Sequence, residues 1–218
     1  MRKTWIKAVA SALLGAACIV AQAGVIATDA TPGWFDADSG VRTLRIGEHG
    51  IVGNVTLDID FAKCNDPGVG DDGQCFDNTG SFDNEIYFRL SSPTGATVSL
   101  VEPRTYAGNS VGAGRVTVRF DDAAGWQVGS LGFNRGNVTA GSFRPIEALA
   151  GLGGDDMFGD WTLLVGDAGY ADPLQYFGAR LEVTGSGPAE VGEPGMVAVM
   201  GVGLLAMGAS LGLRRRRE

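Results

Sequence analysis

Apolar side chains recur at every second position in short runs between about residue 41 and residue 183. In "NVTLDIDF" the residues Val55, Leu57, Ile59 and Phe61 would share one face of an extended chain, and "EIYFRL", "RVTVRF", "DWTLLV" and "YFGARLEV" repeat the pattern. A period of two is the side-chain period of a β-strand and indicates strands that are buried on one face. This part of the chain has no long run of apolar residues at helical spacing. The pattern therefore predicts an all-β fold.

Turn sequences separate these runs. Glycine accounts for 35 of the 218 residues, and stretches such as "SSPTGA", "YAGNSVGAG" and "VGDAGYADP" combine it with proline, asparagine or aspartate. These are the residues of tight turns. The chain between the turns has room for about eight strands, which suits a jelly-roll β-sandwich. We expect one such domain over residues 24–184.

The first 23 residues are typical of a secretory signal peptide. Basic residues among the first seven positions precede an apolar stretch, and small residues lead up to Ala23. This order predicts a signal helix that is removed after Ala23, so that the mature protein is exported. A second interpretation, in which Cys18 is the acylated residue of a lipoprotein, stays open, although Gly15 stands where such signals prefer leucine.

The C-terminal segment has the pattern of a membrane-directed tail. Residues 185–195, "GSGPAEVGEPG", are typical of a flexible linker. Residues 196–213 carry no charge and would extend for about 27 Å as a transmembrane helix. The tail 214–218 that follows, four arginines and Glu218, would remain in the cytoplasm under the positive-inside rule.

The same tail resembles the PEP-CTERM sorting signal of Gram-negative bacteria. In that signal a Pro-Glu-Pro motif, a transmembrane helix and a basic cluster follow one another. Here Glu193 and Pro194 keep part of the motif, and Gly192 replaces its first proline. The resemblance implies an exosortase as a partner, with delivery of the protein to the cell envelope, the cell surface or the extracellular matrix. A permanent single-pass anchor is the alternative.

Two cysteines follow the signal peptide, and both lie in "CNDPGVGDDGQC". Export to an oxidising compartment predicts a disulfide between Cys64 and Cys75, which would close a glycine-rich loop. Two unpaired thiols are the alternative. A structural zinc site is not expected, because no further cysteine or histidine lies near these two in the sequence.

The chain is acidic, with a formal net charge of -8 at pH 7. Much of its positive charge lies in the signal peptide and the tail, so the domain between them is more acidic still. Such a surface repels nucleic acid and attracts cations. Aspartate-rich turns of exported proteins often supply calcium ligands, and a plain solvated acidic surface is the alternative.

Four stretches of the sequence occur in the order seen in one family of domains. They are "IYFRLSSPTGATVSLVE", "VTVRFDDAAG", "GSFRPIEALAGLGGDDMFGDWTLLVGD" and "DPLQYFGARLEV". Together they resemble the P domain, or P/Homo B domain, of subtilisin-like proprotein convertases, over about residues 46–183. The resemblance implies a jelly-roll β-sandwich. Phe177 stands where the family usually has tryptophan, and the loop from Cys64 to Cys75 looks like an insertion.

The P domain of convertases accompanies a serine protease, but the residues of this chain predict no enzyme. A Ser-His-Asp triad needs a histidine base within a catalytic domain, whereas the sole histidine, His49, lies in the turn-like stretch "GEHG". The many aspartates could supply the two carboxylates of a glycosidase, but nothing in the sequence places two of them at catalytic separation. We expect no catalytic residues.

Three carboxylates are candidate calcium ligands. Asp121 and Asp122 follow the strand "VTVRF", and Glu85 opens the strand "EIYFRL" with Asp83 and Asn84 before it. Carboxylates at strand ends can present several oxygen ligands to Ca²⁺, and calcium would then stabilise the domain. The alternative is that Asp122 only caps a turn.

Two further groups of side chains bear on a binding role. An acidic cluster surrounds the cysteine loop, but its spacing matches no EF-hand, so a solvated loop is expected. Trp161 alternates with apolar residues and is expected in the core, whereas Trp126 lies in a loop and is open to stacking on a sugar. The members of the acidic cluster are Asp66, Asp71, Asp72, Asp77 and Asn78.

These features predict an exported, non-enzymatic protein of the cell surface or extracellular matrix, stabilised by calcium, with an adhesion or matrix role. Its partners would be the exosortase and either exopolysaccharide or another surface protein. One alternative is an accessory P domain that works in trans with a subtilisin-type serine protease. The other alternative is a carbohydrate-binding module.

Overall fold

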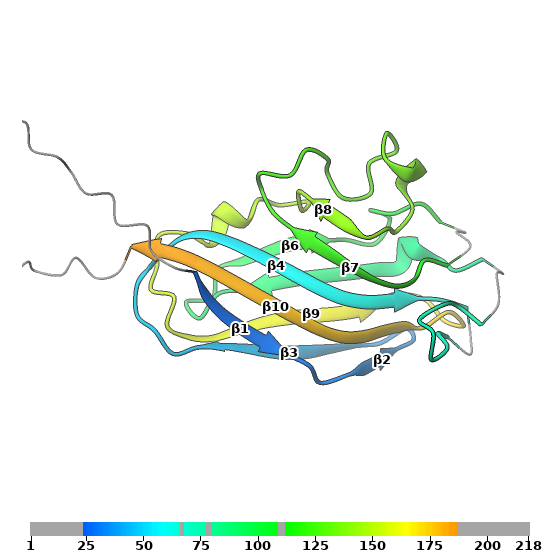
Figure 1. Ribbon diagram of the computed structural model, residues 1–218, viewed down its shortest axis with the longest axis horizontal. Helices are drawn as coiled ribbons and strands as arrows, with labels where there is room; N and C mark the ends of the chain where they lie inside the picture. The colour runs from blue at the N-terminus through cyan, green and yellow to red at the C-terminus, as the bar shows by residue number, and fades with distance from the viewer. Residues whose placement is uncertain (1–23, 66–67, 77–79, 109–111, 187–218) are drawn as a thin grey trace, which may run out of the picture.

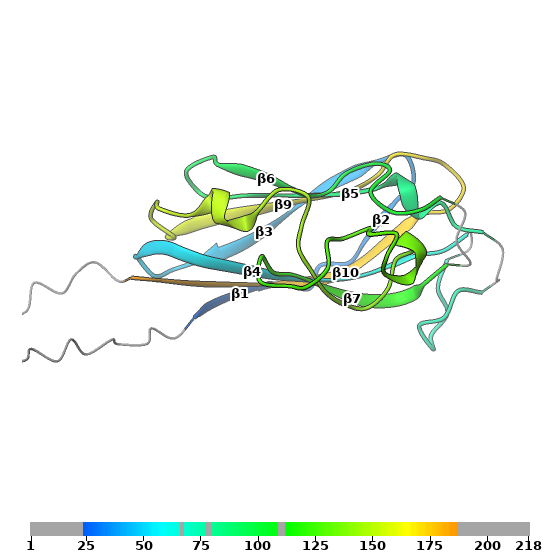
Figure 2. The same cartoon turned by 90° about the horizontal axis from the view of Figure 1, so that it is seen from above.

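The computed structural model describes residues 24–65, 68–76, 80–108 and 112–186, and these fold into two β-sheets that face each other (Figure 2). In this part of the chain the larger sheet has six strands, ordered β1 (Val25–Asp29), β10 (Leu174–Ser186), β4 (Ile51–Lys63), β7 (Gly114–Phe120) and β8 (Gly141–Phe143), with β2 (Gly33–Phe35) also paired to β10. The smaller sheet has the order β3 (Ser39–Ile46), β9 (Gly159–Asp167), β5 (Ile86–Ser91) and β6 (Thr97–Val101). Short 3-10 helices lie between strands: η1 (Asp83–Glu85), η2 (Asn134–Gly136) and η3 (Leu149–Leu152).

The core lies between the two sheets and is formed by the residues that alternate in the sequence. Leu57, Ile59 and Phe61 of β4 are fully buried. The ring of Phe61 meets that of Phe88 from the smaller sheet edge to face, with 5.1 Å between the ring centroids. Apolar burial of this kind supplies about 25 cal/mol per Å². The predicted all-β, two-layer fold is therefore confirmed, and the period of two is the cause of it.

The two ends of the described domain lie close together. β1 pairs with β10 in antiparallel register, with Val25 opposite Val183, and both chain ends leave the same end of the sandwich (Figure 1). Within the described ranges no helix is long and apolar enough to cross a membrane. The predicted signal peptide (1–23), transmembrane helix (196–213), basic tail and sorting residues Glu193 and Pro194 lie outside the described residues.

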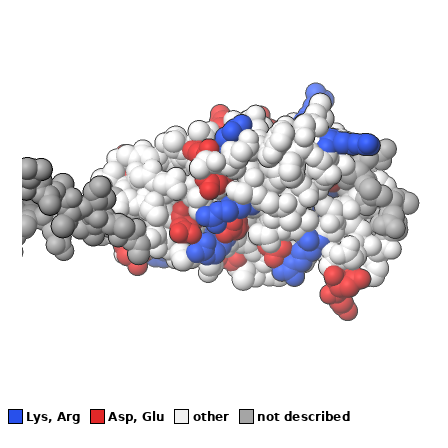
Figure 3. Space-filling view, turned by 45° about the horizontal axis from the view of Figure 1, so that its top comes forward, with Lys and Arg blue, Asp and Glu red and all other residues white. Residues whose placement is uncertain are grey.

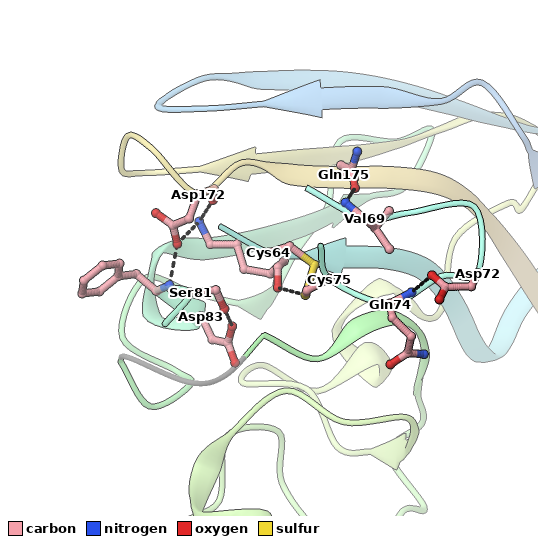
Figure 4. Close-up of a disulfide and its surroundings, with 11 residues drawn as sticks. Cys64, Val69, Asp72, Gln74, Cys75, Ser81, Asp83, Asp172 and Gln175 are labelled. Carbon is pink, nitrogen blue, oxygen red and sulfur yellow. Dashed lines mark hydrogen bonds and ion pairs between the residues drawn. A yellow bond between two sulfur atoms is a disulfide. The ribbon is translucent and has the colours of Figure 1, made fainter. Parts of the chain in front are cut away.

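The predicted disulfide is present. Cys64 directly follows the last residue of β4, and it is bonded to Cys75. The loop that the disulfide closes is held by a bridge between Val69 and Cys75, by the side chain of Gln175 against Val69, and by Asp72, which accepts from the N–H of Gln74 (Figure 4). Asp66, Asp77 and Asn78 lie outside the described residues.

Candidate binding face

The outer face of the larger sheet carries a band of charged side chains. Because every second residue of a strand points away from the core, the buried apolar residues of β4 and β7 leave their neighbours facing outward. These outward residues include Asp58 and Asp60 on β4 and Arg115 and Arg119 on β7, all of them at least partly exposed. Figure 3 shows positive and negative side chains alternating across the middle of one face of the molecule.

Neighbouring strands place opposite charges side by side within this band. The strand register pairs Asp58 with Arg180 of β10 on one side and with Arg119 of β7 on the other. Asp58 Oδ2 lies 3.1 Å from Arg119 Nη1 and 3.6 Å from Arg180 Nη1. Glu182 adds a second carboxylate, with its Oε2 3.0 Å from Arg180 Nη1. The charged groups hold one another in place while part of each stays in contact with solvent.

An aromatic ring and a hollow lie at one end of the band. Arg115 donates to both carboxylate oxygens of Asp60, with 2.6 Å between Nη2 and Oδ2. The same guanidinium lies over the ring of Phe177, 4.2 Å from its centroid, a stabilising cation–π contact. A hollow of about 480 Å³ opens beside these groups and is lined by residues of β1, β4, β7 and β10.

A second hollow, of about 320 Å³, adjoins the first at Phe177 and extends to Trp34 on β2. The indole of Trp34 is 48% exposed, and Gln175 offers an amide beside it in the lining of this hollow. The exposed indole of Trp34, the half-buried ring of Phe177 and ordered polar groups thus border one continuous stretch of surface. Such a surface can hydrogen-bond hydroxyl groups through its charged groups and can stack an apolar ring face on its aromatic side chains.

A second group of charged side chains is buried between the sheets. The ammonium of Lys63, the last residue of β4, lies 2.6 Å from Asp167 Oδ2, 3.0 Å from Asp172 Oδ2 and 3.3 Å from Glu85 Oε2. It also donates to the main-chain carbonyl of Asp172. The side chains of Lys63 and Asp167 are fully buried, and that of Glu85 is 24% exposed. A lysine from the larger sheet is therefore paired with carboxylates at the end of the smaller sheet and in the loop that follows it.

Burial dominates the electrostatics of this group. Burial raises the pKa of Asp167 and that of Glu85, in both cases against the opposing influence of Lys63. Burial also acts to lower the pKa of Lys63, but the hydrogen bonds and charges of Asp167 and Asp172 outweigh it and raise that pKa. The folded chain consequently binds protons more tightly at this position than the unfolded chain does.

The predicted calcium ligands do not come together in the structure. Glu85 ends η1 and pairs with Lys63, whereas the two oxygens of Asp122 accept from the N–H groups of Leu149 and Ala150, at 2.9 and 2.8 Å. Across the described ranges no group of three or more histidine, cysteine, aspartate or glutamate side chains is arranged to hold a metal ion. Glu85 and Asp122 therefore contact different parts of the chain. Calcium binding by Glu85, Asp121 and Asp122 stays a prediction.

Asp121 and Asp83 have local partners as well. Asp121 Oδ1 accepts from the N–H of Ala123, 2.8 Å away. Asp83 is buried and accepts from the hydroxyl of Ser81 and the N–H of Val138. Asp71 and Asp72 are exposed, as expected of a solvated loop. Hydrogen bonds to nearby backbone are the usual role of aspartate in turns.

His49 lies in an exposed turn, as its sequence context indicates. Its Nδ1 lies 2.7 Å from Asp156 Oδ2, and its ring stacks on Phe158 with 4.2 Å between the centroids. Asp156 also accepts from two backbone N–H groups, and these bonds, with that of His49 the largest, lower the pKa of Asp156 to about 2. The described contacts of His49 include no serine or threonine hydroxyl.

The tryptophans divide as the sequence predicts, with one addition. Trp161 is fully buried, and its Nε1 donates to the carbonyl of Met157. Trp126 is 47% exposed in a loop, where its ring lies against Phe133. Sequence reasoning missed Trp34, because "TPGWFDADSG" has a three-residue strand that shows no alternation of its own. The sequence signal that could have identified Trp34 is an aromatic residue between a proline and an aspartate-rich turn.

Comparison with known proteins gives a distant structural likeness. No protein-family model matches the sequence, and no curated protein matches it. Among solved structures, the chain is similar to one described as the crystal structure of Aeromonas sobria serine protease (ASP) and the chaperone (ORF2) complex, with 14% sequence identity and a TM-score of 0.36. The likeness covers 74% of this chain and 27% of that chain, so this chain spans about a quarter of the matched one. The two-sheet architecture of this protein rests on its own strand order, not on that likeness.

Proposed function

We propose that this chain is an exported, non-enzymatic module that binds a neutral polysaccharide on the outer face of its larger sheet. The observation that carries the proposal is the surface on which Trp34 and Phe177 border the charged band. A sugar ring has an apolar face that stacks on aromatic side chains and hydroxyl groups that exchange hydrogen bonds with guanidinium and carboxylate groups. Both kinds of group lie here within adjoining hollows.

The charge of this face supports a neutral ligand over an anionic one. Asp58 and Asp60 stand among the arginines of the band, so a phosphate or uronate group placed there would meet carboxylates as well as cations. The chain as a whole carries a net charge of -8, which disfavours anionic polymers further. Two hollows that adjoin at Phe177 favour a ligand longer than one sugar unit, which supports a polysaccharide.

Export and sorting are part of the proposal. The disulfide between Cys64 and Cys75 is typical of proteins that mature in an oxidising compartment. We infer that residues 1–23 direct export and that an exosortase processes the tail near Glu193 and Pro194. The module would then reach the cell surface or extracellular matrix of a Gram-negative bacterium and act there in adhesion. We further infer that the two sheets form a jelly roll of the P/Homo B type.

A glycan array followed by titration tests the binding site. Mature protein should bind neutral polysaccharides on the array, and Trp34→Ala should weaken binding of the best ligand about tenfold, because a stacked indole contributes on the order of 1 kcal/mol. Trp126→Ala is a matched control, since its indole is equally exposed but lies in a loop away from the hollows. It should bind as the unchanged protein does.

Other outcomes would contradict the proposal. Equal weakening by Trp34→Ala and Trp126→Ala would show that the outer face is not the site. Binding to no glycan, together with recovery of a subtilisin-type protease on a column of the mature protein, would favour the accessory-domain alternative. Exported protein that keeps residues 214–217 in a host with an exosortase would contradict sorting and leave a permanent anchor.

A further inference from the structure

The residue at the centre of the buried cluster is unusual for this sequence. Lys63 is the only lysine after residue 7, and the other Lys or Arg positions from there on are arginines. For an ion pair alone an arginine serves at least as well, since its planar guanidinium makes two hydrogen bonds to a carboxylate. A lysine differs in having a primary amine, which can act as a nucleophile. The one lysine of the domain lies beside a carboxyl group, that of Asp167, which a nucleophilic amine could attack.

The carboxyl group of Asp167 is arranged as an electrophile for this amine. Lys63 Nζ lies 2.6 Å from Asp167 Oδ2, and both side chains are fully buried. The N–H of Gly169 donates to Oδ1 and the N–H of Leu174 donates to Oδ2, each at 3.1 Å. Backbone N–H groups aimed at both oxygens stabilise the negative charge that develops on a carboxyl group under attack. Asp172 has no comparable pair, because its described partners are the ammonium of Lys63 and one N–H, from Phe82.

A third carboxyl group, that of Glu85, is close enough to Lys63 to transfer a proton. Glu85 Oε2 lies 3.3 Å from Lys63 Nζ, and the Glu85 side chain is partly exposed to solvent. A carboxyl group within this reach can take a proton from the amine and return it to a departing oxygen. The electrophile, Asp167, and the proton carrier, Glu85, thus both contact the nucleophilic atom, Lys63 Nζ.

We propose that Lys63 and Asp167 condense within the folded protein to form an isopeptide bond, with Glu85 as the proton carrier. One proton passes from the ammonium to the Asp167 carboxylate, which leaves a neutral amine and a neutral acid. Nζ then forms a bond to Cγ of Asp167, and the bond from Cγ to one oxygen breaks. Glu85 takes a second proton from Nζ and delivers it to that oxygen, which leaves as water. The amide keeps one hydrogen on nitrogen, and no other reagent is consumed.

Burial favours this reaction over a lasting ion pair. Charges removed from water are costly even when they are paired, and condensation eliminates two of them. The two groups are already in contact, and held reactants react as if at very high concentration. The product would join the last residue of β4 to the last residue of β9. It would therefore tie the two sheets together one residue away from the disulfide.

Intact mass under reducing conditions tests the proposal on mature protein. After folding at neutral pH, the mass should be lower than the sequence mass by one water, and the missing water should map to a peptide pair that joins Lys63 to Asp167. In denaturant, an amine-reactive probe should find no free ε-amine at Lys63. Full sequence mass with a labelled Lys63 would overturn the proposal.

Matched variants separate this reaction from other losses of water. Lys63→Arg keeps the positive charge but should have its full sequence mass, and Glu85→Gln, at a partly exposed position, should do so while remaining folded by circular dichroism. Aspartate before glycine, as at Asp72, can lose water on its own, so a loss that persists in Lys63→Arg would contradict the proposal. A cross-link that maps to Asp172 would contradict the assignment of Asp167.

Discussion

Replacing both Cys64 and Cys75 by alanine should lower the free energy of unfolding by about 3 kcal/mol. The two residues are 11 positions apart, and closing a loop of this length in the unfolded chain is worth about 3 kcal/mol at 25 °C in the chain-entropy treatment. In the folded state the loop contacts the rest of the domain through few backbone hydrogen bonds, among them one from Arg115 to Gly73. For a domain of this size the loss corresponds to a decrease in Tm of about 6–12 °C.

Thermal unfolding followed by circular dichroism measures this effect. The unchanged protein in reductant should approach the Tm of the double variant, and the double variant should be insensitive to reductant. Because Cys64 is buried, part of the variant's loss comes from packing, and reduced protein that keeps both sulfur atoms separates the two contributions. An equal Tm for the unchanged protein and the double variant, each with and without reductant, would refute the loop-closure argument.

Two other substitutions should have distinct effects. Asp122→Ala removes both acceptors for the N–H groups of Leu149 and Ala150, so it should cost about 1–2 kcal/mol of stability by chemical denaturation. The cost should be the same in chelator and in millimolar calcium, and a cost that appears only with calcium would instead show metal ligation. Asp156 has a pKa lowered to about 2, with the hydrogen bond of His49 as the largest cause, so its contribution to stability is complete above about pH 4 and is lost as the pH falls toward 2. The difference in Tm between the unchanged protein and Asp156→Asn should shrink across that window, and a constant difference would contradict the interpretation.

The sequence alone determined the strand-forming segments and the pairing of the cysteines. Alternation in "NVTLDIDF" placed Leu57, Ile59 and Phe61 in the core, because a strand exposes its two faces in turn and only one face can be buried. The disulfide followed from export and from having only two cysteines after the signal peptide. Two short strands, β1 and β2, escaped this reasoning, because three to five residues are too few to establish a period.

Only the tertiary structure decided which residues from distant strands meet. Lys63 and Asp167 are separated by 104 positions, and Asp58 finds its arginines on β7 and β10. The predicted calcium ligands Glu85 and Asp122 have similar places at strand ends in the sequence, yet they contact different parts of the chain. The reason is physical: local periodicity specifies whether a side chain is buried, whereas its partner depends on strand order and register, which the packing of the whole core selects.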